Sequence, residues 1–76
     1  MNEAIAAAIR SRMADADVDV HLDGNRALIT VVSADFEDLS RVKKQQLVYA
    51  CIEDYIRDGT LHAVTIRALT PAEAGG

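Results

Sequence analysis

Two side chains of this sequence, His21 and His62, are of a type that binds metal ions, and Cys51 is the one thiol. Neutral imidazole is a common metal ligand. One histidine alone is a weak indication of a site, so spacing leaves open whether His62 is a ligand or a partly buried structural residue. His21 alternates with apolar residues, which favours a surface position and leaves a ligand role as the alternative.

Cys51 falls within the apolar stripe of a predicted long helix. A free cysteine in that setting usually behaves as a small hydrophobic residue, whereas a reactive thiol needs an exposed, electropositive environment. A single cysteine also excludes an intrachain disulfide, which favours a reducing compartment. The N-terminal segment is too polar for a signal peptide, and no apolar run approaches ~20 residues. These features predict a cytoplasmic protein that does not enter a membrane.

A cluster of cations, Arg41, Lys43 and Lys44, stands at the start of the same predicted helix. Cations there oppose the helix dipole, which indicates a use such as binding a carboxylate, a phosphate or, weakly, DNA. The alternative is a solvated surface balanced by the acidic residues of the preceding connection. The formal net charge of −4 and the pI of about 4.9 count against nucleic acid as the main partner, because the overall field repels phosphate.

Sequence motifs for catalysis are absent. The chain has no P-loop, no nucleophile elbow and no metal-binding quartet, and its paired acidic residues fall where solvated faces are expected. It also lacks the Gly-X-X-Gly loop of an RNA-binding KH module. We therefore predict a protein that is not an enzyme and that acts by binding partners.

The elements that must position these side chains follow from the spacing of apolar residues. The segment 23–26 (DGNR) has the composition of a tight turn, and Gly59 suits the left-handed conformation that ends a helix. Ser40 is a predicted N-cap, and 70–73 (TPAE) matches a capping box with proline at the first helical position. The predicted elements are a helix from about Asn2 to Met13, strands at 17–22, 27–33 and 61–69, a helix from 40 to 57 with a break near Lys44–Gln46, and a C-terminal helical stub.

Alternation in the third strand places His62 on one face with Val64 and Ile66. The 76 residues suffice for one domain with a small core. One sheet with helices packed on one face would bury every apolar stripe. The sequence therefore predicts a single α+β domain over residues 1–76, in the order αββαβ(α), with a three-stranded mixed sheet and helices on one face, an architecture that matches KH-type modules.

Two motifs resemble the BolA family, and within it the YrbA-like branch. The first is Ser40–Tyr49 (SRVKKQQLVY), at the start of the predicted long helix. The second is Leu61–Ile66 (LHAVTI), followed by Leu69–Glu73 (LTPAE). The spacing between the motifs is also that of the family, so the likeness covers residues 36–73 by sequence and the earlier segments by pattern.

The resemblance implies a BolA-like fold, related to class II KH domains, and partnership with a monothiol glutaredoxin that carries the CGFS sequence. In such complexes a 2Fe-2S cluster is held jointly, and the BolA protein supplies ligands from its side. The near-invariant histidine of the family maps onto His62. The family's second ligand lies in the loop between the first two strands. Residues 23–26 contain neither histidine nor cysteine here, so His21 is the nearest candidate for the second metal ligand.

The resemblance also implies alternatives, because some family members are described as transcriptional regulators. A DNA-binding, stress-response regulator would act through Arg41, Lys43 and Lys44. A third reading is an acid-stress factor whose two histidines, His21 and His62, respond to pH. In every case we expect the chain to be a monomer alone, or a weak homodimer.

Overall fold

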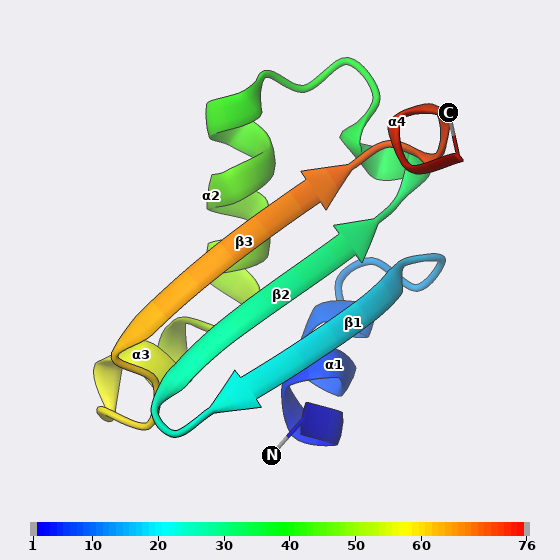
Figure 1. Cartoon of the computed structure of the whole chain (residues 1–76). Coiled ribbons are helices and arrows are strands. Elements are labelled where there is room, and N and C mark those ends of the chain that lie inside the picture. The colour runs from blue at the N-terminus through cyan, green and yellow to red at the C-terminus, as the bar shows by residue number, and fades with distance from the viewer. Residues whose placement is uncertain (1, 76) are drawn as a thin grey trace.

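The computed structural model describes residues 2–75 and forms one α+β unit (Figure 1). The chain starts with a helix, makes two strands, forms two successive helices, and returns to the sheet before a short C-terminal helix. In order the elements are α1 (Asn2–Arg10), β1 (Asp17–Asp23), β2 (Arg26–Val32), the 3-10 turn η1 (Ala34–Phe36), α2 (Arg41–Cys51), α3 (Glu53–Arg57), β3 (Ala63–Leu69) and α4 (Pro71–Gly75).

The three strands form a mixed sheet in the order β1-β2-β3. β1 and β2 are antiparallel, with Asp23 opposite Arg26, so the hairpin turn contains only Gly24 and Asn25. Gly24 has a φ of 61°, the positive value that the first central position of a type II′ turn requires. β3 lies parallel to β2, with Arg26 opposite Ala63. The hairpin turn and the start of β3 therefore meet at the same end of the sheet (Figure 1).

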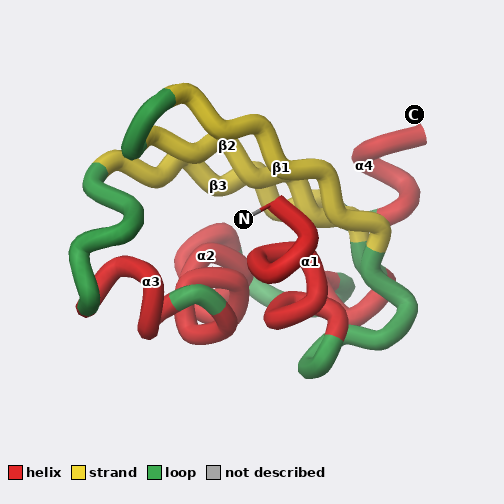
Figure 2. The backbone as a smooth tube through the Cα atoms, turned by 90° about the horizontal axis from the view of Figure 1, so that it is seen from below, coloured by secondary structure: helices red, strands yellow, loops and turns green. Residues whose placement is uncertain are grey.

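α1, α2 and α3 lie on one face of the sheet, α4 lies at the end of β3, and the other face is open (Figure 2). Alternate residues of β2 point into the core, where they meet α1, α2 and η1. Burial of these apolar side chains is the main favourable contribution to folding, since each contributes about 1.5–3 kcal/mol. The fully buried large side chains are Ile5, Ile9, Met13, Ile29, Val31, Phe36, Val48 and Ile52. This arrangement confirms the predicted fold class.

Two predicted helix boundaries are wrong. α1 ends at Arg10 rather than Met13, although Met13 still donates its N–H to the Ile9 carbonyl at 3.0 Å and is buried. The long helix is continuous through 44–46 and breaks instead at Ile52, which has a φ of −116°. The reason lies outside the helix: Lys44 and Gln45 both bond to the C-terminal third of the chain, which holds this segment against the sheet.

The predicted caps are confirmed. The Ser40 hydroxyl accepts a hydrogen bond from the Lys43 N–H at 3.2 Å, and Gly59 has a φ of 83°. Thr70 and Glu73 form the reciprocal bonds of a capping box, at 2.9 and 3.2 Å. None of the helices within residues 2–75 combines the length and apolar character needed to cross a membrane.

Replacing Ile29 by alanine should destabilise the domain by about 2–5 kcal/mol, because the side chain is fully buried at the centre of β2. Leu28→Ala on the same strand is the matched control. Leu28 faces the open side of the sheet, so its loss should cost about 1 kcal/mol. Urea unfolding of the two variants measures both values. Equal losses would contradict the one-sided core.

Candidate functional site

His62 lies between α3 and β3, where the main chain is held on both sides. The preceding residue, Leu61, is buried, and its N–H donates to the Tyr55 carbonyl at 3.1 Å. The N–H of His62 itself donates to the Asn25 carbonyl, in the hairpin turn, at 2.9 Å. The imidazole, in contrast, is exposed and makes no hydrogen bond within the described part of the chain. A rigid backbone thus presents a ring whose two nitrogens are available to another molecule.

The expected position of His62 within the third strand is wrong. β3 begins at Ala63, and His62 does not share the half-buried environment of Val64 and Ile66. Leu61 fills the last buried position before the strand, and the chain turns to reach the Asn25 carbonyl before regular pairing starts. The side chain at 62 therefore meets solvent instead of continuing the inward row. This exposure removes the alternative of a partly buried structural histidine.

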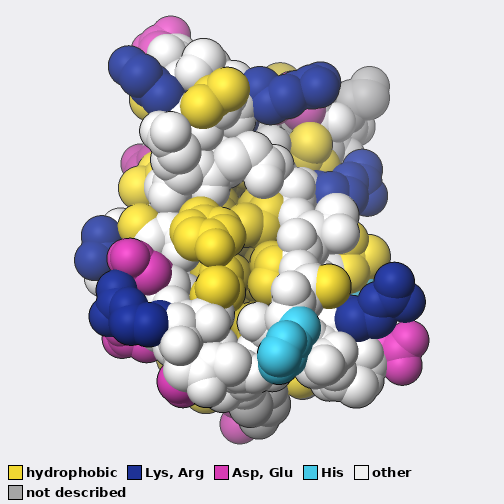
Figure 3. Space-filling view, turned by 90° about the vertical axis from the view of Figure 1, so that its left-hand side faces the viewer, with side chains coloured by type: hydrophobic (Ala, Val, Ile, Leu, Met, Phe, Trp, Pro, Cys, Tyr) yellow, Lys and Arg dark blue, Asp and Glu magenta, His cyan; other side chains and the backbone are white. Residues whose placement is uncertain are grey.

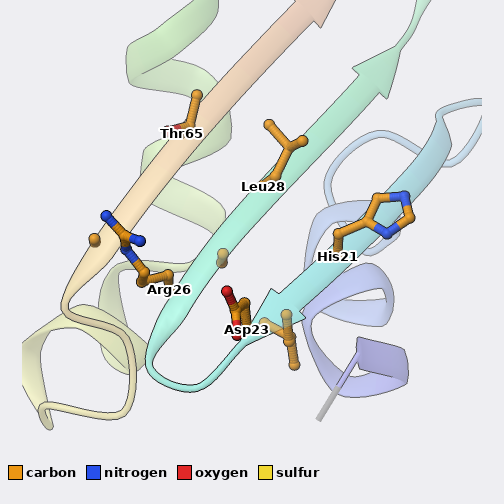
Figure 4. Close-up of a pocket in the computed structure, with 8 residues that line it drawn as sticks. His21, Asp23, Arg26, Leu28 and Thr65 are labelled. Atoms are coloured by element: carbon orange, nitrogen blue, oxygen red, sulfur yellow. The ribbon is translucent and has the colours of Figure 1, made fainter.

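His21 lies on the open face of β1, and its side chain is 72% exposed. Its Nε2 atom is 3.0 Å from a carboxylate oxygen of Asp19, two residues earlier on the same face. Figure 4 shows the imidazole projecting from β1, on the sheet surface that also carries Leu28 and Thr65. This exposed position agrees with the one that strand alternation predicts.

The strand register separates the two histidines. His21 is opposite Leu28, and Leu28 is opposite Thr65, which is three residues beyond His62. The Cα atoms of the histidines are therefore about 10 Å apart across the sheet and about 10 Å apart along it. Two ligands of one metal ion must bring their nitrogens within about 4 Å of each other. Residues 2–75 contain no group of three or more histidine, cysteine, aspartate or glutamate side chains that is arranged for a metal ion.

A shallow hollow of about 300 Å³ crosses the open face of the sheet near the hairpin turn. Leu28 and Thr65 lie along it, and the side chains of Asp23 and Arg26 stand at its turn end (Figure 4). Ala63, the neighbour of His62, also lines it. The sequence gives little sign of this hollow, because its lining residues come from three strands that pair only in the folded sheet. Its lining combines apolar side chains with charged and polar ones, as surfaces that contact other proteins commonly do.

Cys51 has the structural character that the sequence predicts. The side chain is half-buried at the end of α2, and Sγ donates to the Leu47 carbonyl at 3.3 Å. Burial raises the pKa of the Cys51 thiol above its ordinary value, and the positive charge of Arg12 only partly opposes this. The thiol therefore stays protonated at neutral pH, which is unfavourable for metal binding or nucleophilic attack.

The three residues of the basic cluster have different surroundings. Arg41 and Lys43 are exposed at the start of α2, whereas the Lys44 side chain is only 14% exposed. Lys44 Nζ is 2.9 Å from a carboxylate oxygen of Glu73, in α4. The counter-charge thus comes from the C-terminal helix and not from the acidic connection before α2. Sequence reasoning missed this pair because the partners are far apart in the chain.

Glu73 has an altered acidity for a clear reason. The hydrogen bond from the Thr70 main-chain N–H, with the bond from Lys44, lowers the pKa of the Glu73 carboxyl from 4.5 to about 2. The same carboxylate oxygen accepts both bonds, at 2.9 Å each. Glu73 therefore joins the start of α4, the end of β3 and the side of α2 through one ionised group.

The element order and the mixed sheet define the class of this protein as a small α+β domain of the class II KH-like type. The family model described as BolA-like protein matches residues 9–73. Acid stress protein IbaG of Escherichia coli K12 is 40% identical over 72 residues, covering 95% of this chain and 86% of that protein. A protein from the rpoN-murA intergenic region of Acinetobacter guillouiae is 36% identical over 72 residues, covering 95% of this chain and 87% of its own length. The chain therefore belongs to the BolA-like family.

Solved structures agree with this assignment at the level of the fold. BolA1 from Arabidopsis thaliana superimposes with a TM-score of 0.84 at 23% identity, over 95% of this chain and 93% of that one. The BolA domain of SufE1 from the same plant gives the same TM-score and coverage at 26% identity. The resemblance predicted from the two sequence motifs is thus confirmed.

Glu73 should make stability depend on pH in the acid range. Its pKa is lower in the folded protein than in the unfolded one, so its contribution is complete above pH ~4.5 and is lost as the pH falls towards 2. Glu73→Gln keeps a hydrogen-bonding group at the cap but removes the charge. Urea unfolding from pH 2 to 7 should show the variant less stable than wild type at pH 7 and equally stable near pH 2.

Lys44→Met provides the control for the source of this effect. Removing the ammonium group should raise the pKa of Glu73 part of the way back, because the Thr70 bonds remain. NMR titration of the Glu73 carboxyl carbon measures the midpoint directly. A midpoint near 4.5 in the wild-type protein would show that the capping box and the ion pair do not persist in solution.

Proposed function

We propose that this chain is a non-enzymatic adaptor in iron–sulfur cluster handling, which binds a monothiol glutaredoxin of the CGFS type and supplies His62 as a ligand to a shared 2Fe-2S cluster. The observation that carries the proposal is the state of His62: a fixed main chain and an exposed imidazole with no bonding partner within residues 2–75. A histidine held for a structural purpose normally satisfies at least one ring nitrogen. The rim of the sheet, where His62 lies, is also open to a second protein.

The set of possible ligands fits a cluster that is shared and not one that this chain holds alone. His62 offers one nitrogen donor, His21 is separated from it by the sheet, and Cys51 is protonated and half-buried. A 2Fe-2S cluster needs four protein or small-molecule ligands and transfers single electrons when bound. A partner must therefore contribute the remaining ligands, which is the arrangement that the family resemblance implies. The role of this chain is to orient one imidazole and to cover one side of the site.

The comparisons support a role in stress physiology as the setting for this activity. A relative with 40% identity is named an acid stress protein, and we extend that setting to this chain. A BolA domain also occurs as part of SufE1 in Arabidopsis thaliana, so such domains are used in combination with other protein units. The single free thiol suits a reducing compartment such as the cytoplasm.

The His62→Ala variant tests the ligand role. The 2Fe-2S cluster is reconstituted on a CGFS glutaredoxin, this chain is added, and visible circular dichroism records the ligand environment. Wild type should change the spectrum, because one cluster ligand is exchanged for imidazole. His62→Ala should lose that change and bind the cluster-loaded glutaredoxin about tenfold more weakly or worse.

His21→Ala is the matched control, because it removes the same side chain from the other end of the exposed surface. We expect the spectrum with this variant to match that with wild type, since His21 bonds to Asp19 and lies far from His62. A spectrum that changes equally with wild type and His62→Ala would exclude His62 as a ligand. Failure of wild type to bind the glutaredoxin at all would refute the adaptor proposal itself.

A further inference from the structure

The outer edge of β3 has main-chain groups that no strand pairs with. The Ala63 N–H donates to the Asn25 carbonyl at 3.4 Å, and the Leu69 carbonyl accepts from the Ser33 N–H at 3.1 Å, so both ends of β3 bond toward β2. Hydrogen-bonding direction alternates along a strand in a parallel pair. The N–H and C=O groups of Val64, Ile66 and Ala68 consequently point away from β2, toward the edge.

One side chain bonds to this edge. Gln45 Nε2, from α2, donates to the Ile66 carbonyl at 2.7 Å. Within residues 2–75, no other hydrogen bond reaches the edge groups of Val64, Ile66 or Ala68. An open edge strand of this kind is a template for pairing with another chain, and proteins usually block it with charge, proline or a covering segment. Among the described residues, the side-chain amide of Gln45 is the one group that hydrogen-bonds to the outward main-chain groups of β3.

The helix beside the edge adds exposed apolar surface. Val42 and Tyr49 lie three residues before and four residues after Gln45, so the three side chains share one face of α2. Val42 is 63% exposed and Tyr49 is 45% exposed, and both rank among the large hydrophobic side chains left open to solvent. Figure 3 views this side of the molecule and shows hydrophobic side chains at its centre, with Lys and Arg side chains around them.

A basic hollow of about 290 Å³ lies at the carboxyl-terminal half of the edge. It is lined by the cations Arg41, Lys44 and Arg67, with Glu73 as the opposing carboxylate, and by Ala68 of the edge strand. Two positive charges therefore remain in excess, in a chain whose formal net charge is −4. A second hollow of the same volume lies on the other side of Gln45, beside Tyr49.

We infer that the β3 edge binds an extended, acidic segment of a partner protein by strand addition. The backbone of the segment would pair with Val64, Ile66 and Ala68, an acidic side chain would enter the basic hollow, and an apolar side chain would lie on Val42 and Tyr49. Strand addition takes its affinity from main-chain hydrogen bonds and its specificity from alternate side chains, and this edge offers both. The surface begins two residues beyond His62, but none of the proposed contacts uses the imidazole, so the inference does not depend on the cluster role.

Two other occupants fit less well. A second copy of the chain, paired through the same edge, would bring β3 (AVTIRAL) against the edge, and that strand has no acidic side chain to enter the basic hollow. A nucleic acid has no ladder of alternating donors and acceptors to match a strand edge. An acidic peptide satisfies the backbone groups and the charge together.

The test uses isotope-labelled protein and a blocked synthetic peptide of alternating valine and glutamate. Amide NMR signals of Val64, Ile66 and Ala68 should shift on titration, and their hydrogen exchange should slow, because those N–H groups become bonded. A peptide of alternating valine and lysine is the matched probe and should leave the signals unchanged. Equal binding of the two peptides, or no effect at this edge at millimolar peptide, would overturn the inference.

Two variants separate charge from backbone pairing. Arg67→Glu should weaken binding of the acidic peptide about tenfold or more, whereas Arg10→Glu, the same change on α1, should have little effect. Ala68→Pro removes one edge N–H but leaves the bonds to β2, since its N–H points outward. Thermal unfolding checks that each variant folds. Retained affinity in Ala68→Pro and Arg67→Glu would contradict strand addition.

Duplex DNA and self-association complete the test. Addition of DNA should leave the edge amides unperturbed at ~150 mM salt, where nonspecific charge attraction is weak. Dilution of the free protein should likewise leave them unchanged. Edge signals that move with DNA, or with protein concentration and not with the acidic peptide, would assign this surface to nucleic acid or to a dimer and refute the inference.

Discussion

The inward rows of the three strands must be buried, and the rest of the structure depends on how they are covered. The apolar faces of α1 and α2 bury these rows, with Ile29 and Val31 at the centre. Within residues 2–75, no strand pairs with the outer edge of β3, and the helices leave the opposite face open (Figure 2). The open face and the β3 edge are the places where exposed side chains gather.

The position of His62 depends on main-chain contacts more than on its neighbours in the sequence. Leu61 is drawn into the core, and the His62 N–H is fixed by a carbonyl of the hairpin turn. Neither contact uses the imidazole. The His62 imidazole can therefore remain unbonded while the main chain around it stays ordered. Such an arrangement suits a proposed ligand whose metal is presented by another molecule.

Local patterns in the sequence account for most of the fold. The alternation of Val18 and Val20, the cap at Ser40 and the capping box at Thr70 each predict an element that the structure contains. These features succeed because periodicity and capping involve residues within one turn or one strand. The family resemblance of the two motifs is also sufficient to identify the fold.

Features that depend on distant contacts were not predicted from the sequence. The break at Ile52, the pairing of Lys44 with Glu73 and the contact of Gln45 with Ile66 all depend on where β3 and α4 return to the helix. The strand pattern predicts a start of β3 that is two residues early, because it does not show the burial of Leu61 or the contact of the main chain with Asn25. A ligand role for either histidine remains a prediction, since spacing alone does not distinguish it from an exposed residue.

The Asn25 carbonyl receives the N–H groups of both His62 and Ala63, and this single oxygen connects the hairpin to the returning strand. Because the acceptor belongs to the backbone, many amino acids at position 25 would serve equally well. The length of the turn, however, is not free: an extra residue would carry the oxygen away from both donors. The hairpin turn can thus accumulate substitutions over evolutionary time, whereas insertions and deletions are eliminated. The length of the turn would therefore be better preserved than its amino-acid sequence.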